Sequence, residues 1–461
     1  MTTNTEVDAS TAHLDRRSRL VVLTVALAAL IAVVDGTIVT ASLQTIAADL
    51  GTGLQTAVWF TSAYLLAAGT TMPLSGWLME RFGVRRVFFV ALIGFVVGSV
   101  LCALAWSPAA LIVFRVAQGL GGGLLEPAAL TIAATTAGPQ RMGKVMGALS
   151  GVINVAPVLG PLAGGFLAGT GSWEWIFLIN LPLGVLVLGG AIALLRGTTD
   201  HAAAARRPDL LGLVMLPAAF VLLLLASERI SSAGSAVPAL LAVGGVIVLA
   251  AWVWRARRAA RQSVIDLDLL RNRGFRAGLL VMAVVGFTMY FQLVALALYS
   301  ARALGWHGTR AGLVVASLGA GLLVSMTLSG RASDRVGSRR IVTLAAASTA
   351  IMAVVLAALH DRIAIGVLLG LLVVLGLAFG SVAAPAFSSV YRSVPGDKIA
   401  RATPALFMTV QLGAATGASV AALLMDRLAA GTALTAGYLS IAVLTVLARA
   451  IARALPGPPA P

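Results

Sequence analysis

Long apolar segments recur along the whole chain and restrict its possible folds more than any other feature. A helix of about 20 apolar residues matches the roughly 30 Å hydrocarbon core of a bilayer. In lipid the backbone can satisfy its hydrogen bonds only as a helix or a closed barrel, so the pattern predicts an all-α integral membrane protein. We expect fourteen spans, near residues 20–46, 54–79, 85–106, 109–135, 144–169, 175–195, 209–227, 236–254, 276–300, 310–330, 340–359, 363–386, 402–425 and 433–454.

Composition agrees with this class. Of the 461 residues, 59% are hydrophobic and only 11% are charged, which is outside the range of soluble domains. Residues 1–19 are polar and the first apolar run is longer than a signal-peptide core, so we expect no cleavable signal. The single cysteine, Cys102, excludes an internal disulfide and a cysteine-based metal site.

The basic residues provide an independent test of the span count. When the N-terminus is placed in the cytoplasm, nearly all Lys and Arg residues fall in inside segments, as cytoplasmic loops require. The exceptions are Arg115, which lies in a span, and five residues of the outside loops: Arg229, Arg302, Arg310, Arg362 and Arg427. We therefore expect both termini in the cytoplasm and the chain in the plasma membrane. The net charge of +16 is then a topology signal, which favours contact with lipid headgroups over nucleic-acid binding.

An internal repeat indicates how the spans are grouped. One copy follows the second span and the other follows the tenth, and their Gly, acidic and Arg positions share one register: Gly76, Glu80, Arg81, Gly83 and Arg85 match Gly330, Asp334, Arg335, Gly337 and Arg339. Parallel repeats of this kind build one class of transporters. We interpret both copies as a latch in which the acid holds arginines at the start of the next helix and closes the cytoplasmic side. The alternative is a pair of basic turns that only set topology.

The repeat predicts two six-helix bundles with two extra helices between them. The expected divisions are a cytoplasmic tail (1–19), an N-terminal bundle (20–196), two additional spans with a basic linker (197–274), a C-terminal bundle (275–454) and a second tail (455–461). Nothing in the pattern demands a second subunit, so we expect a monomer.

The fourth span carries two opposite charges. Because a helix advances about 100° per residue, Arg115, Gln118, Gly119, Gly122 and Glu126 share one face. The two charges lie roughly 16 Å apart along the axis, too far to pair with each other. Each therefore needs a partner on another helix or water. Ionisable groups inside a span mark ion or substrate pathways.

Asp35 and Glu126 are the only acids that we place inside spans. Asp35 lies in the first span at about the depth of Arg115, whereas Glu126 lies deeper, beside Pro127, with no basic residue at its depth. We interpret Asp35, Arg115 and Glu126 as the proton-coupling residues, and Glu126 is also suited to attract a cationic substrate. A static Asp35–Arg115 ion pair and a permanently protonated Glu126 remain open alternatives.

Several motifs resemble the major facilitator superfamily, in particular its fourteen-spanner drug:proton antiporters. The repeat loop at Gly76 resembles the signature loop of that family, with Glu80 where Asp is usual, and the stretches beginning at Asp35 and Arg115 resemble its first-span and fourth-span motifs. Residues 173–184 also match closely. The fifth span resembles the antiporter motif through Gly151, Pro157, Gly160, Pro161, Gly164 and Gly165. The resemblance implies that Asp35 and Arg115 pair and that the chain exports its substrate.

Aromatic and amide side chains are candidates for contacts with the substrate. Aromatic rings suit flat lipophilic or cationic compounds, although such stripes also serve helix packing. The candidate cavity residues are Phe60, Tyr64, Gln118, Asn154, Phe287, Tyr290, Phe291 and Gln292.

These features predict a proton-coupled antiporter that exports lipophilic or cationic drugs by alternating access. Export of a lipid or of a self-made metabolite remains open, and an uptake symporter is disfavoured by the antiporter motif. We find no nucleophile–base pair and no metal cluster in the spans, so we do not expect an enzyme. No Gly-rich loop ends in Lys-Ser/Thr, so we expect no nucleotide or other cofactor, and the proton gradient supplies the energy. The expected partners are a small-molecule substrate, protons and membrane lipids, without nucleic acid.

Overall fold

The computed structural model describes most of the chain, and all regular structure in the described residues is helical. Eleven of these helices are long and apolar enough to cross a membrane, and Leu211–Ser227 is a shorter apolar helix. The all-α class is therefore confirmed, whereas the count of fourteen spans stays a prediction. The described residues are 15–57, 59–137, 141–142, 145–146, 149, 152, 156, 159–160, 163, 172–195, 209–229, 236–258, 267–306 and 309–457.

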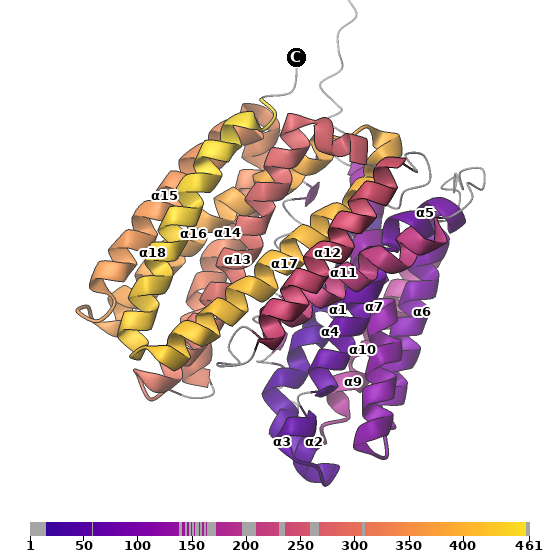
Figure 1. Ribbon diagram of the computed structural model, residues 1–461, viewed down its shortest axis with the longest axis horizontal. Helices are drawn as coiled ribbons and strands as arrows, with labels where there is room; N and C mark the ends of the chain where they lie inside the picture. The colour runs from indigo at the N-terminus through magenta and orange to yellow at the C-terminus, as the bar shows by residue number, and fades with distance from the viewer. Residues whose placement is uncertain are drawn as a thin grey trace, which may run out of the picture.

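Two helical bundles lie side by side, and the helices of the middle of the chain lie over the seam between them (Figure 1). The first bundle holds α1 (Arg16–Ile38), α2 (Leu43–Asp49), α3 (Leu54–Ala57), α4 (Trp59–Thr71), α5 (Ser75–Phe82), α6 (Val84–Ala103), α7 (Pro108–Ala137), α9 (Trp175–Leu178) and α10 (Asn180–Leu194). The middle helices are α11 (Leu210–Glu228) and α12 (Val237–Arg258). The second bundle holds α13 (Arg273–Arg302), α14 (Thr309–Val336), α15 (Ser338–Leu359), α16 (Ile365–Arg392), α17 (Ile399–Arg427) and α18 (Ala430–Ile451). Short 3-10 turns are η2 (Val39–Ser42), η4 (Leu267–Arg271), η5 (Gly396–Lys398) and η6 (Ala452–Ala454).

Glycines bring the helices of each bundle into close contact. A Cβ atom at Gly119 of α7 would lie 2.4 Å from the Tyr64 carbonyl oxygen of α4. In the second bundle a Cβ atom at Gly413 of α17 would lie 2.3 Å from the Ala283 carbonyl oxygen of α13. No side chain fits at such distances, so these helices approach at backbone distance, as small residues allow in membranes.

The two copies of the sequence repeat form turns of the same backbone geometry. Gly83 precedes α6 with φ 85° and ψ 143°, and Gly337 precedes α15 with φ 87° and ψ 147°. This conformation is readily adopted only by glycine, which explains why both copies carry a glycine at this position.

The middle helices are fixed to both bundles. α11 packs against α12, α17 and α4. Asp209 caps the start of α11 by accepting a hydrogen bond from the Gly212 amide at 3.0 Å, and it forms an ion pair with Arg255 of α12 at 2.7 Å. Near the other end of α11, the Ser227 and Thr416 hydroxyls lie 3.2 Å apart. These contacts hold α11 against the seam where the two bundles meet.

Candidate functional site

An ion pair lies inside the first bundle. Arg115 of α7 and Asp35 of α1 are both fully buried, and their side chains meet at 2.5 Å. The guanidinium also donates to the Gln118 side-chain oxygen and to the Phe60 carbonyl oxygen, each at 2.7 Å. The predicted partnership of Asp35 and Arg115 is thus present in this conformation.

Three donors surround the carboxylate of Asp35. Besides Arg115, its oxygens accept hydrogen bonds from the Gln118 amide at 2.9 Å and the Asn180 amide at 2.7 Å. Both amides also donate to the Ser99 hydroxyl, which donates in turn to the Phe177 carbonyl oxygen. Buried charges are tolerated when they are paired and hydrogen-bonded in this way. The network therefore gives both oxygens of the Asp35 carboxylate a partner and ties α1, α6, α7 and α10 together.

Tyr64 of α4 forms a wall beside the ion pair. The Arg115 guanidinium lies over its ring at 4.3 Å from the centroid, and its hydroxyl donates to the Ala32 carbonyl oxygen at 2.9 Å. Tyr64 also lines the cavity described next, whereas neither Asp35 nor Arg115 does. A molecule in that cavity would contact Tyr64 and not the ion pair.

A cavity of about 380 Å³ lies between the two bundles. The first bundle contributes residues of α1, α4 and α7, and the second contributes residues of α13, α14, α16 and α17. The lining is mostly apolar and includes Met72, Met282, Met289, Met326, Phe387 and Phe407. Volumes of this size hold drug-sized molecules.

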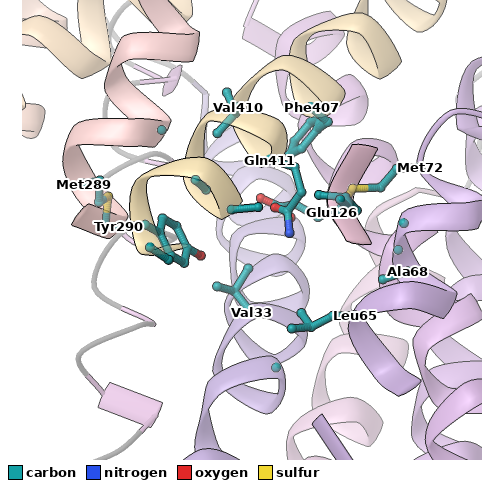
Figure 2. A pocket seen from close by; sticks show the side chains of 18 of the residues that line it. Val33, Leu65, Ala68, Met72, Glu126, Met289, Tyr290, Phe407, Val410 and Gln411 are labelled. Atoms are coloured by element: carbon teal, nitrogen blue, oxygen red, sulfur yellow. The ribbon is translucent and has the colours of Figure 1, made fainter. Parts of the chain in front are cut away.

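Glu126 is the one acidic residue among the described residues that line the cavity, and they include no Lys, Arg or His. Within the described part of the chain, no salt bridge or hydrogen bond reaches its carboxylate. Figure 2 shows Glu126 of α7 and Gln411 of α17 pointing into the same part of the cavity. Pro127 follows Glu126 inside α7 and lacks an N–H, so it cannot donate to the carbonyl of Gly123 one turn earlier. The cavity thus combines one anion with apolar walls.

The structure separates the predicted cavity residues into two groups. Tyr64 and Tyr290 line the cavity together with Glu126. Of the other candidates, those that the structure describes do not line the cavity in this conformation. Phe60 and Gln118 belong to the ion-pair network. Phe287 stacks on Phe291, Phe291 packs against Gly437, and Gln292 donates to the Thr288 carbonyl oxygen. The rotation of α13 explains the division, because Met282, Met289 and Tyr290 occupy its cavity face.

Most of the fifth-span motif lies outside the described residues: Gly151, Asn154, Pro157, Pro161, Gly164 and Gly165. Gly160 is described, and a Cβ atom there would lie 2.0 Å from the Thr37 hydroxyl oxygen of α1. Thr37 lines the cavity. Gly160, in the expected fifth span, therefore packs directly against a residue of the cavity wall.

Sequence reasoning did not select three residues that belong to the site. Asn180 and Ser99 complete the shell around Asp35, and Gln411 faces Glu126 across the cavity. Asn180 and Gln411 could have been found in the sequence because each is an amide residue within an otherwise apolar span.

The latch acids have partners other than the predicted ones. Glu80 at the end of α5 accepts two hydrogen bonds from Arg401 of α17, one of 2.8 Å from Nη2. Asp334 lies 3.6 Å from Arg392 of α16. The prediction placed the partner arginine at the start of the following helix. Because α5 packs against α17, Glu80 instead meets an arginine of the opposite bundle.

The remaining residues of the two repeat copies include exposed arginines and buried glycines. Arg85 lies over the Phe89 ring at 5.7 Å from its centroid. Gly76 is buried in the first turn of α5, and Gly330 is buried within α14. Arg81, Arg335 and Arg339 are exposed.

Comparisons with known proteins match this architecture. The family model described as Major Facilitator Superfamily matches residues 25–265 and 278–461. A multidrug resistance protein B homolog of Mycobacterium tuberculosis is 31% identical over 406 residues, which cover 87% of this chain and 74% of the relative. A putative multidrug resistance protein MdtD of Klebsiella pneumoniae is 33% identical over 405 residues, covering 85% and 83%. The multidrug export protein EmrB of Escherichia coli is 30% identical over 334 residues, covering 71% and 64%.

Two solved structures share the fold. The human organic anion transporter MFSD10 superposes with a TM-score of 0.65 at 17% identity, covering 94% of this chain and 99% of that protein. The proton:xylose symporter XylE superposes with a TM-score of 0.65 at 17% identity, covering 95% of each chain. At this identity the likeness supports the fold alone.

Proposed function

Because the chain belongs to the Major Facilitator Superfamily, we propose that it is a secondary active exporter that exchanges lipophilic or cationic toxic compounds for protons. The observation that carries this proposal is the cavity between the bundles, in which Glu126 of one half faces apolar walls from both halves. An apolar cavity accepts lipophilic bodies, and a lone carboxylate in it accepts either a proton or a positive charge. The names of the relatives favour export over uptake.

Alternating access supplies the transport step of this proposal. The bundles rock about the central cavity, so that it opens first to one side of the membrane and then to the other. The contact between Glu80 and Arg401 joins the bundles at the ends of α5 and α17 that we assign to the cytoplasmic side. In this proposal the contact helps to close that side.

Proton coupling is assigned to Asp35 and Glu126. Asp35 is paired with Arg115 in this conformation, and a movement that separates α1 from α7 would remove this partner and open the carboxylate to a proton. Glu126 already faces the cavity, so a proton and a cationic substrate compete for it. Competition of this kind produces antiport.

The topology that we propose has fourteen spans in the plasma membrane, with both termini in the cytoplasm and one chain as the working unit. The asymmetric placement of Lys and Arg supports it. Cysteine labelling in a Cys102→Ala background tests it, with His201→Cys as the reporter of the segment that precedes α11 in the sequence. Labelling of that cysteine from outside intact cells would contradict the topology.

Transport into inverted membrane vesicles tests the function. An acid-inside pH gradient should drive accumulation of fluorescent cationic and neutral lipophilic compounds, and a protonophore should abolish it. Vesicles without the protein are the control. Accumulation that does not depend on the pH gradient, or movement of the compounds in the opposite direction, would rule out proton-coupled export. Including a labelled lipid in the panel separates drug export from lipid export.

A further inference from the structure

We propose that the cavity selects lipophilic amines carrying one protonated, N–H-bearing nitrogen, held between Glu126 of the first bundle and Gln411 of the second. This inference rests on the proposed export function and specifies its substrate class. It makes Gln411, which no motif singles out, a residue that determines specificity.

The charge of the substrate follows from the cavity lining. One carboxylate faces the cavity, and the described lining residues include no cationic side chain. A single positive charge is therefore balanced by Glu126. A second positive charge would stay uncompensated among apolar walls, and an anion would face the Glu126 carboxylate without any cationic side chain among the described lining residues, so both are disfavoured.

The apolar part of the substrate is inferred from the side chains that line the cavity. Met72 and Met326 come from α4–α5 and α14, and Met282 and Met289 come from α13. Methionine side chains are unbranched and polarisable, so they adapt to apolar groups of different shape. Tyr64, Tyr290, Phe387 and Phe407 add aromatic rings, which favour flat or cationic groups. We infer tolerance of many ring systems around one fixed charge.

The requirement for an N–H group follows from Gln411. Its amide carries a carbonyl oxygen that accepts hydrogen bonds, and among the described residues it has no hydrogen-bond partner. A protonated primary, secondary or tertiary amine can donate to this oxygen while its charge faces Glu126. A quaternary ammonium has no N–H and leaves the amide unpaired, which weakens its binding.

The position of the two side chains joins substrate binding to closure of the bundles. Glu126 lies on α7 and Gln411 on α17, and these helices already meet where the Thr131 and Thr403 hydroxyls lie 3.2 Å apart. An amine bound to both side chains bridges the two halves. A quaternary compound reaches Glu126 by charge alone and makes no hydrogen bond to the second half.

Equilibrium binding to the purified full-length protein tests this inference. The probes share one aromatic body: a protonated tertiary amine, its N-methyl quaternary derivative and a neutral analogue. The wild-type protein should bind the tertiary amine roughly tenfold more tightly than the quaternary derivative, as a hydrogen bond to a charged group predicts. Gln411→Leu should abolish this difference without changing quaternary binding. Glu126→Gln should weaken both cations at least about tenfold and leave the neutral probe unchanged.

Two further variants keep the test decisive. Gln292→Leu is the matched control, because Gln292 is buried in α13 but does not line the cavity, and it should keep the tertiary-over-quaternary preference. Gln411→Glu adds a second acid and should increase the affinity for a dicationic analogue. Neutral-probe binding verifies that each variant retains a folded cavity.

The outcomes separate this inference from the export function. If Gln411→Leu keeps the preference for the tertiary amine, or Glu126→Gln binds the cations as the wild type does, the inference is wrong even when vesicles still export neutral compounds. If the Gln411 and Glu126 variants change binding as expected but no compound is transported in response to the pH gradient, the binding site is supported and the export function is wrong.

Discussion

Arg401 and Glu80 lie 321 positions apart and form an ion pair that joins the two bundles. The Arg401 side chain is 16% exposed and that of Glu80 is 24% exposed, so water weakens the pair only in part. Because α5 and α17 belong to opposite halves, any movement that parts the halves at this end must break this contact.

Removal of this contact should favour the conformation that is open at this end. A partly exposed ion pair contributes about 1 kcal/mol, so Glu80→Gln or Arg401→Gln should shift the equilibrium roughly fivefold and lower turnover. A cysteine at Thr403, which is buried between the halves, should react correspondingly faster with a maleimide in a Cys102→Ala background.

Asp268→Asn is the control for this prediction. It breaks the exposed pair with Arg271 within η4 and should change neither labelling nor turnover. Wild-type labelling and turnover in both Glu80→Gln and Arg401→Gln would remove the contact from the mechanism.

The repeat glycines should be sensitive to substitution. Gly83→Ala or Gly337→Ala forces a residue with a Cβ atom into a positive φ, which costs about 1–3 kcal/mol. The thermal unfolding midpoint of the purified protein should fall. Gly94→Ala in the middle of α6 is the matched control, because no atom lies within 4 Å of its added Cβ, and it should be neutral or stabilising. Equal midpoints for Gly83→Ala and Gly94→Ala would contradict the prediction.

The cap of α11 should make stability depend on pH. Burial of Asp209, which precedes the helix, opposes its ionisation, but hydrogen bonds from Arg255 and the Gly212 amide outweigh this and lower its pKa from 3.8. Its stabilising effect is therefore complete above the unfolded-state pKa and is lost as the pH falls through the lower folded-state value.

Asp209→Ala should destabilise the protein by about 1 kcal/mol at pH 7, as loss of a helix cap does. The difference from the wild type should shrink at a pH below 3.8, where Asp209 begins to be protonated. Asp209→Asn retains a capping oxygen but no charge and should lie between the two. Thermal unfolding at both pH values measures this, and a difference that grows in acid would refute it.

The sequence was sufficient to predict the helical class, because apolar length and charge placement indicate which segments cross the membrane. It also placed Asp35 and Arg115 at about the same depth, where buried charges need partners. That the two residues pair with each other was implied by the family resemblance, and the structure contains this pair. The backbone geometry shared by Gly83 and Gly337 agrees with the repeat.

The sequence could not predict which face of each helix meets which neighbour. Tyr290 and Phe291 are adjacent in one aromatic stripe, yet Tyr290 lines the cavity while Phe291 packs against Gly437. Only the rotation of α13 against α17 and α18 decides between them. Glu80 likewise meets Arg401 because of the packing of α5 on α17, which local spacing does not contain.

Asp35 is held by several buried hydrogen bonds, so variants must distinguish its structural role from a role in proton coupling. Asp35→Asn leaves Arg115 buried without a counter-charge, and breaking a buried pair in this way costs about 3–5 kcal/mol. Loss of export in the single variant is therefore ambiguous. Asp35→Asn/Arg115→Gln removes both charges and should recover most of the stability. If Asp35 carries protons, this double variant should still bind neutral compounds but show no pH-driven export.

Proton release from the purified protein measures the coupling directly. Addition of a cationic substrate should release protons from the wild type, less from Glu126→Gln and none from Asp35→Asn/Glu126→Gln. Asp361→Asn is the control, because Asp361 lies outside the cavity and is 57% exposed, and it should release protons as the wild type does. Release from the Asp35→Asn/Glu126→Gln variant at the wild-type level would mean that other groups carry the protons, and Asp35 would then serve to hold α1 against α7.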